Sequence, residues 1–281
     1  KTIDTFQIAI VHTLFSVIYT LMLLPFGKQL ERLAVLSIPD SKDDPQPVML
    51  DERLLATPAI AVEQTRVLAA DMAKLVRKSV QAAIALLGNY SEKGYNEVAK
   101  LEKEADNYED EIGTYLVKVS MQELSDADSR DVTKILHSIT DFERISDHAL
   151  NIAQSAREMA EKKLNFSPAA QAELKVMTGA IDEIVGIAIG GFGSDSVDAA
   201  RHVEPLEEVV DELNTNIRAA HIKRLKDGEC TIELGFVFTD LLTNYERVSD
   251  HCSNIAVYTM QLPSDKLDAH KYLAKIKNSE D

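Results

Sequence analysis

The sequence has no tryptophan, only two cysteines, and few glycines and prolines, 11 and 8 among 281 residues. Cys230 and Cys252 form neither a CxxC pair nor a disulfide framework, which favours a reducing compartment over a secreted one. The scarcity of Gly and Pro, together with abundant Ala, Leu, Ile, Glu and Lys, indicates a mainly helical chain.

Positive charge is also in short supply, because 30 Lys and Arg stand against 46 Asp and Glu and leave a formal net charge of −16. Binding nucleic acid requires basic side chains to neutralise phosphates, so a nucleic-acid partner is excluded. The signatures GxSxG, HExxH and Glu-x-x-His are absent, and the glycine cluster at 190–193 lacks a P-loop lysine. We therefore expect no enzyme and no catalytic or organic-cofactor site.

One motif occurs twice. The segment ITDFERISDHALNIA at 139–153 returns about one hundred residues later as LTNYERVSDHCSNIA at 242–256. Both copies carry Glu-Arg, Ser-Asp-His and Asn-Ile-Ala at the same relative positions. A weaker match relates LEKEADNYEDEI, from Leu101, to LEEVVDELNTNI, from Leu206. The chain therefore contains two related halves.

Apolar residues recur at three- and four-residue steps throughout both halves, which predicts helices and no strands. The expected helices cover about 58–88, 92–119, 125–153, 168–190, 195–225 and 231–260, with Pro205 either kinking the fifth or marking its start. The predicted fold is all-α, with two repeated three-helix bundles behind an apolar helix. The expected segments are a membrane helix at 1–30, a linker at 31–53, repeat 1 at 54–164, repeat 2 at 165–262 and a polar tail at 263–281.

An apolar run between Asp4 and Lys28 is about 23 residues long, enough to cross a bilayer. We expect contact with a membrane through residues 5–27. Lys28 and Arg32 follow the run and place the rest of the chain in the cytoplasm by the positive-inside rule. The polar residues within the run leave a second interpretation open, a buried or dimer-forming helix.

Each half carries two pairs of acidic residues four positions apart, which places both carboxylates of a pair on one patch of a helix. Their oxygen ligands suit Mg²⁺, Mn²⁺, Ca²⁺ or iron, so we predict a divalent or iron metal ion bound by these residues. The predicted ligands are Glu102 with Asp106, Glu143 with Asp147, Glu207 with Asp211, and Glu246 with Asp250.

A structural network of carboxylates and arginines is the alternative use of these acids. Arg144 and Arg247 each follow the motif glutamate and point about 100° away along the helix, toward a neighbouring helix. His148 and His251 follow the motif aspartates, and a lone histidine in a helix is more often structural than a metal ligand.

The paired segments ERISDHALNIA and YERVSDHCSNIA resemble the signature of the PhoU family of phosphate regulators, over roughly residues 54–260. That resemblance implies two three-helix repeats and metal sites at the Glu-x-x-x-Asp pairs. The front of the chain resembles the last membrane helix and linker of bacterial sodium/phosphate cotransporters that end in a PhoU-like domain. The resemblance implies phosphate transport and homeostasis, location at the inner cell membrane, and the transporter's own membrane core as a partner.

The transport core itself is absent from these residues, so the chain alone could not transport phosphate. The sequence leaves open whether the chain forms a homo-oligomer. A second function is also left open, in which the acidic faces dock a protein partner.

Overall fold

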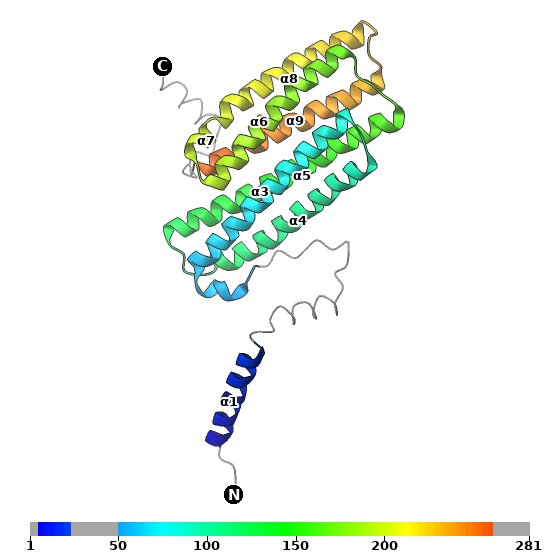
Figure 1. Cartoon of the computed structure of the whole chain (residues 1–281). Helices are drawn as coiled ribbons and strands as arrows, with labels where there is room; N and C mark the ends of the chain where they lie inside the picture. Colours follow the sequence, from blue (N-terminus) through cyan, green and yellow to red (C-terminus); the bar gives the residue numbers. More distant parts are fainter. Residues whose placement is uncertain (1–4, 24–49, 261–281) are drawn as a thin grey trace. The chain divides into compact units, whose positions relative to one another are not determined.

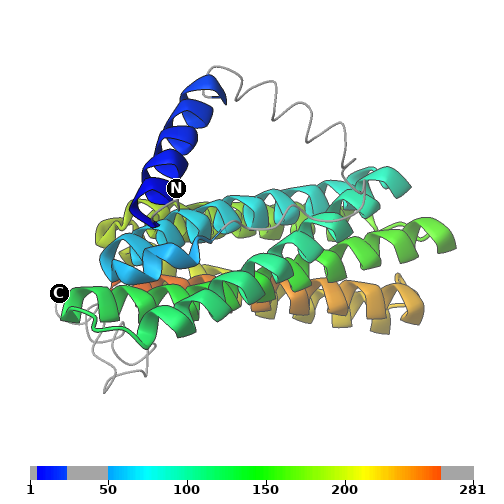
Figure 2. The same cartoon turned by 90° about the horizontal axis from the view of Figure 1, so that it is seen from below.

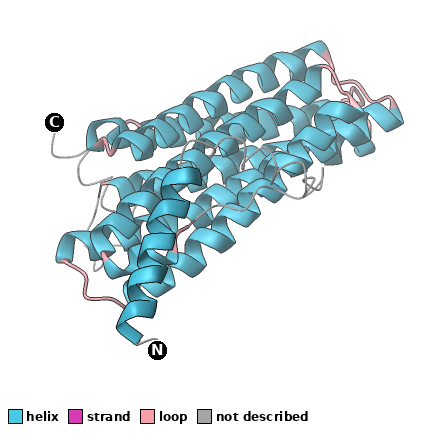
Figure 3. Ribbon diagram, turned by 60° about the horizontal axis from the view of Figure 1, so that its bottom comes forward, coloured by secondary structure: helices cyan, strands magenta, loops and turns pink. Residues whose placement is uncertain are grey.

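The computed structural model describes residues 5–23 and 50–260, and every regular element in those two ranges is a helix (Figure 3). The expected all-helical fold is therefore confirmed. The chain divides into two units, Lys1–Gln46 and Pro47–Asp281.

The first unit contains α1, Thr5–Leu23. All its side chains from Ile10 to Thr20 are exposed, including Phe15 at 65% and Ile18 at 60%. Membrane contact through residues 5–27 stays a prediction, and residues 24–27 lie outside the described part. So do residues 1–4, the linker up to residue 49 and the tail at 263–281.

The first half of the bundle consists of α3, Pro58–Gly88, α4, Glu92–Ser120, and α5, Asp126–Lys162. A short 3-10 helix, η2 at Glu52–Ala56, precedes them. Figures 1 and 2 show the three long helices side by side. Ser125 begins α5 as predicted, because its Oγ accepts a hydrogen bond from the backbone N–H of Asp128 at 3.1 Å.

The second half consists of α6, Pro168–Ser194, α7, Val197–Arg201, α8, Val203–Lys226, and α9, Ile232–Thr259. The region expected as one helix at 195–225 is two helices, and Pro205 lies in the first turn of α8. A proline fits there because the first helical N–H groups need no partner within the helix. Pro205 thus marks a helix start rather than a kink.

The helix expected over about 168–190 is longer in the structure, because α6 continues through the glycine cluster at 190–193 to Ser194. A Cβ placed on Gly191 would lie 3.4 Å from Cβ of Ala199, so this glycine lets α7 pack closely on the end of α6. The helix stops at Asp195, which adopts a left-handed conformation with φ of 51°.

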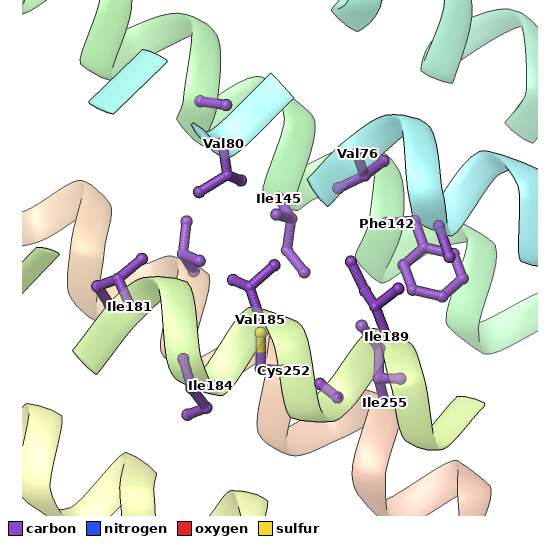
Figure 4. Close-up of a cluster of buried hydrophobic side chains, with 14 of the residues drawn as sticks. Val76, Val80, Phe142, Ile145, Ile181, Ile184, Val185, Ile189, Cys252 and Ile255 are labelled. Atoms are coloured by element: carbon purple, nitrogen blue, oxygen red, sulfur yellow. The ribbon is translucent and has the colours of Figure 1, made fainter. Parts of the chain in front are cut away.

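The two halves share one core. Val76 and Val80 of α3, Ile145 of α5, Val185 of α6 and Cys252 of α9 belong to one apolar cluster (Figure 4). Among the described residues, α6 is the one helix long and apolar enough to cross a membrane, and it is a core helix of this bundle. The apolar part of α1 whose side chains the structure describes, Ile10–Thr20, is shorter. Because α3 packs on α6 and α5 on α9, the repeated motif helices meet at the centre of the bundle.

Candidate functional site: two unequal acidic faces

The first acidic face consists of Glu102 and Asp106 on α4 with Glu143 and Asp147 on α5. The two helices pack against each other, so the two predicted pairs of the first half are brought to one region. Burial, then the charge of Asp147, raises the pKa of Glu143 to about 7. Burial raises the pKa of Glu102 as well, and the charges of Asp147 and Asp106 add to it.

Glu109 is a further member of the first acidic face that sequence reasoning missed. Its carboxylate raises the pKa of Glu143 and accepts a hydrogen bond from Oγ1 of Thr140 at 3.2 Å. The signal was present in the sequence, because Glu102, Asp106 and Glu109 follow the four- and three-residue steps of one helix face.

The carboxylates of the first acidic face are coupled in charge but do not converge on one point. Within residues 5–23 and 50–260, no three His, Cys, Asp or Glu side chains are arranged to hold a metal ion. The oxygen donors are of the type that hard cations prefer. Binding a cation requires these side chains to turn toward a common point, and metal binding stays a prediction.

The second acidic face consists of Glu207 and Asp211 on α8 with Glu246 and Asp250 on α9. Glu207 is only 4% exposed, whereas Asp211 is exposed. Glu246 already has partners: its Oε2 accepts a hydrogen bond from Asn214 at 2.8 Å and lies 3.4 Å from a guanidinium nitrogen of Arg218. The two acidic faces are therefore unequal.

Arg144 and Arg247 form ion pairs with acids on their own helices, whereas the alternative supposed acids on a neighbouring helix. Arg144 is 3.4 Å from Glu143 and 3.9 Å from Asp147, and Arg247 is 3.1 Å from Asp250. Both arginine side chains are more than half exposed, so these pairs contribute little stability.

The motif histidines lie between the halves. Nδ1 of His148 is 2.9 Å from Oδ1 of Asn244, and Nδ1 of His251 is 2.7 Å from Oδ1 of Asp141. The two imidazole rings stack with centroids 5.7 Å apart. These contacts agree with a structural role for both histidines, since each ring joins α5 to α9.

Comparison with known families shows to which family this chain belongs. The profile of the PhoU domain family matches residues 69–156 and 174–259, which are one segment in each half and more than half of the chain. The chain belongs to the PhoU domain family. The crystal structure of PhoU from Pseudomonas aeruginosa covers 76% of this chain and 96% of its own, with a TM-score of 0.66 and 23% identity.

Two sequence relatives differ in what they cover. Phosphate-specific transport system accessory protein PhoU homolog 1 of Thermotoga maritima is 31% identical over 137 residues, 49% of this chain and 58% of its own. The Escherichia coli K12 protein named "Putative inorganic phosphate export protein YjbB" is 24% identical over 280 residues, 93% of this chain. This chain spans about half of that relative's length, 49%.

Proposed function

We propose that this chain is the PhoU-like regulatory end of a membrane protein that transports inorganic phosphate, in the class of sodium/phosphate cotransporters. The observation that carries the proposal is the alignment with the E. coli export relative, which covers 93% of this chain but only half of the relative. It extends beyond the residues that the PhoU profile matches. The test is phosphate flux in membrane vesicles that contain the parent transporter, with and without a sodium gradient. Deletion of residues 54–262 should change the sodium-dependent flux, and an unchanged flux would reject the regulatory role.

The apolar helix α1 supports attachment to a membrane. Its side chains from Ile10 to Thr20 are exposed on every face of the helix, and an apolar surface of this kind requires lipid or other helices around it. Carbonate extraction of cell membranes provides the test. The chain should stay in the membrane pellet, and a variant lacking residues 5–27 should be soluble. Retention of that variant in the pellet would show that α1 is not the anchor.

The first acidic face supports binding of a divalent or iron cation by Glu102, Asp106, Glu143 and Asp147. Burial and, after it, the charge of Asp147 raise the pKa of Glu143, and a cation would relieve the repulsion between these two carboxylates. Mass spectrometry of metal content after removal of affinity tags should find metal in the wild-type chain. The double substitution Asp147→Ala with Asp250→Ala should reduce that content, and an unchanged content in the variant would reject these ligands.

A docking platform is the second candidate function, and the exposed acids favour it. The chain carries a net charge of −16, and Asp106, Asp211 and Asp250 lie at least a third exposed at the surface of the bundle. A basic protein partner would be attracted to such a surface. Crosslinking in cells distinguishes the two functions, because only docking requires a partner captured through the acidic faces.

A non-catalytic role is consistent with the buried cysteine. Cys252 is fully buried, and burial raises the pKa of its thiol far above the ordinary range, so it is not available as a thiolate nucleophile. Cys252 therefore serves as a core residue in the proposed regulator.

A further inference from the structure

Arg218 occupies a defined position on the second acidic face. Its Nε donates a hydrogen bond to Oδ1 of Asn214 at 2.7 Å, and one Nη donates to Oγ1 of Thr243 at 2.9 Å. The same Nη lies 3.4 Å from Oε2 of Glu246. Asn214 is only 4% exposed and donates to that same oxygen, so it fixes both the guanidinium and the carboxylate.

Among its described residues, the first half has no cation that reaches from α4 to the motif glutamate on α5. Its nearest guanidinium is that of Arg144, which lies on the same helix as Glu143, 3.4 Å away, with its side chain 57% exposed. In the repeat, Glu109 takes the place of Asn214 and Gly113 takes the place of Arg218. A Cβ placed on Gly113 would meet only Ile139 Cδ1, at 3.9 Å, so the first half has room for a side chain there but carries none. On the helix that precedes the motif helix, the first half therefore carries an acid and a glycine, and the second half an amide and a cation.

We infer that Arg218, held by Asn214, replaces a metal ion on the second acidic face, so that uptake of a divalent cation is confined to the first acidic face. A fixed guanidinium repels an incoming cation and occupies one of the oxygens that the cation needs as ligands. The second acidic face consequently does not fit the metal that its acidic pairs predict. This inference rests on the proposed metal binding of the first acidic face.

The test is a titration of the full chain with Mn²⁺. Electron paramagnetic resonance measures the free ion, and the number of bound ions is the difference from the total. Glu143→Gln with Asp147→Asn should weaken Mn²⁺ binding at least about tenfold, as expected when ligands are removed. Glu246→Gln with Asp250→Asn should leave both the number and the affinity of bound ions as in the wild type. Loss of Mn²⁺ in this second variant would overturn the inference.

A matched exchange of the two halves sharpens the test. Asn214→Glu with Arg218→Gly gives the second half the residues of the first, and it should raise the number of bound Mn²⁺ ions. Glu109→Asn with Gly113→Arg does the reverse and should abolish Mn²⁺ binding. If the first exchange adds no ion although the variant folds, as judged by circular dichroism, Arg218 is not what excludes the metal.

A measurement without metal separates this inference from the metal proposal. If the wild-type chain binds no Mn²⁺, the metal part of the proposed function fails, and the role of Arg218 as the counter-cation of Glu246 is decided in EDTA. Arg218→Gly should lower the melting temperature by on the order of 2 °C. The loss should be smaller in a Glu246→Gln background, because there only the contacts of Arg218 with Asn214 and Thr243 and the helix propensity of the arginine are lost. An equal effect in both backgrounds would overturn the inference.

Discussion

Oδ1 of Asp141 lies 2.7 Å from Nδ1 of His251, across the contact between α5 and α9. Nδ2 of Asn254 donates to the same oxygen at 3.1 Å. Asn244 is the counterpart of Asp141 in the repeat and accepts from His148. The histidine of each half therefore contacts the equivalent position of the other half: His251 contacts the carboxylate of Asp141, and His148 contacts the neutral amide of Asn244.

Replacing Asp141 should weaken the whole bundle. Asp141 is only 6% exposed, so Asp141→Ala leaves the donors of His251 and Asn254 without their acceptor. We expect a loss of about 1–3 kcal/mol in the free energy of unfolding by urea. Asp141→Asn should lose less, because Asn244 shows that an amide oxygen serves at the equivalent position. The exposed Asp240→Ala is the control and should change little; equal losses at both positions would contradict this account.

The helices were predictable because their signals are local. Apolar residues at helical spacing and the cap at Ser125 act within one or two turns, and the structure confirms the helices they predict. The start of α8 also has a local signal, Pro205 in its first turn, whereas the packing of α7 on α6 depends on tertiary structure. Gly191 permits α7 to approach α6, and this approach cannot be predicted from the local sequence.

The candidate site was predictable only in part, for the same physical reason. Four-residue spacing placed Glu143 and Asp147 together, since both lie on one helix face. The contact of Arg218 with Glu246 spans two helices, so it depends on how α8 packs on α9. The position of Asp141 is likewise set by the packing of α5 on α9, although Asp141 lies within the repeated motif itself.

The first acidic face should make stability depend on pH. The pKa of Glu143 is raised from 4.5 to about 7 in the folded protein, so the unfolded chain loses this proton first as pH rises. The contribution of Glu143 to stability therefore falls between about pH 4.5 and pH 7. Glu143→Gln removes the ionisable group and should be more stable than the wild type at pH 8 by about 1–3 kcal/mol, with little difference at pH 4.5.

Urea unfolding in EDTA at several pH values measures this difference. Glu246→Gln is the matched control, because Asn214 and Arg218 already hold that carboxylate. This control should gain no stability at pH 8. A constant difference between wild type and Glu143→Gln across the pH range would reject Glu143 as the source.

The end of α6 depends on a buried lysine. Nζ of Lys134 is 2.6 Å from Oδ1 of Asp195 and 3.7 Å from Asp131, and the lysine side chain is 4% exposed. Asp195→Gly relieves the left-handed backbone, a gain of up to about 1 kcal/mol, but removes the better partner of a buried charge, a loss of about 2–3 kcal/mol. We expect a net loss of stability by thermal unfolding.

Adding Lys134→Met to Asp195→Gly should recover that loss, because an apolar side chain of similar length carries no unpaired charge. A double variant no more stable than Asp195→Gly would show that Lys134 is not the cause.

Gly235 and His221 form a packing pair specific to the second half. A Cβ on Gly235 would lie 3.1 Å from Nε2 of His221, whose ring packs on Phe238 with centroids 4.7 Å apart. In the first half the corresponding residues are Val132 and Leu116, both buried. Gly235→Val should therefore destabilise the bundle by about 1–3 kcal/mol through overpacking, despite the better helix propensity of valine.

The double variant Gly235→Val with His221→Leu copies the arrangement of the first half and should recover most of that loss, with a coupling of about 1–2 kcal/mol in urea unfolding. It should also remove a pH dependence. Burial lowers the pKa of His221, so protonation of the unfolded chain below about pH 6.5 costs the wild type stability as pH falls. Additive effects of the two substitutions would show that the two residues do not constrain each other, and an unchanged acid sensitivity would place its origin in other groups.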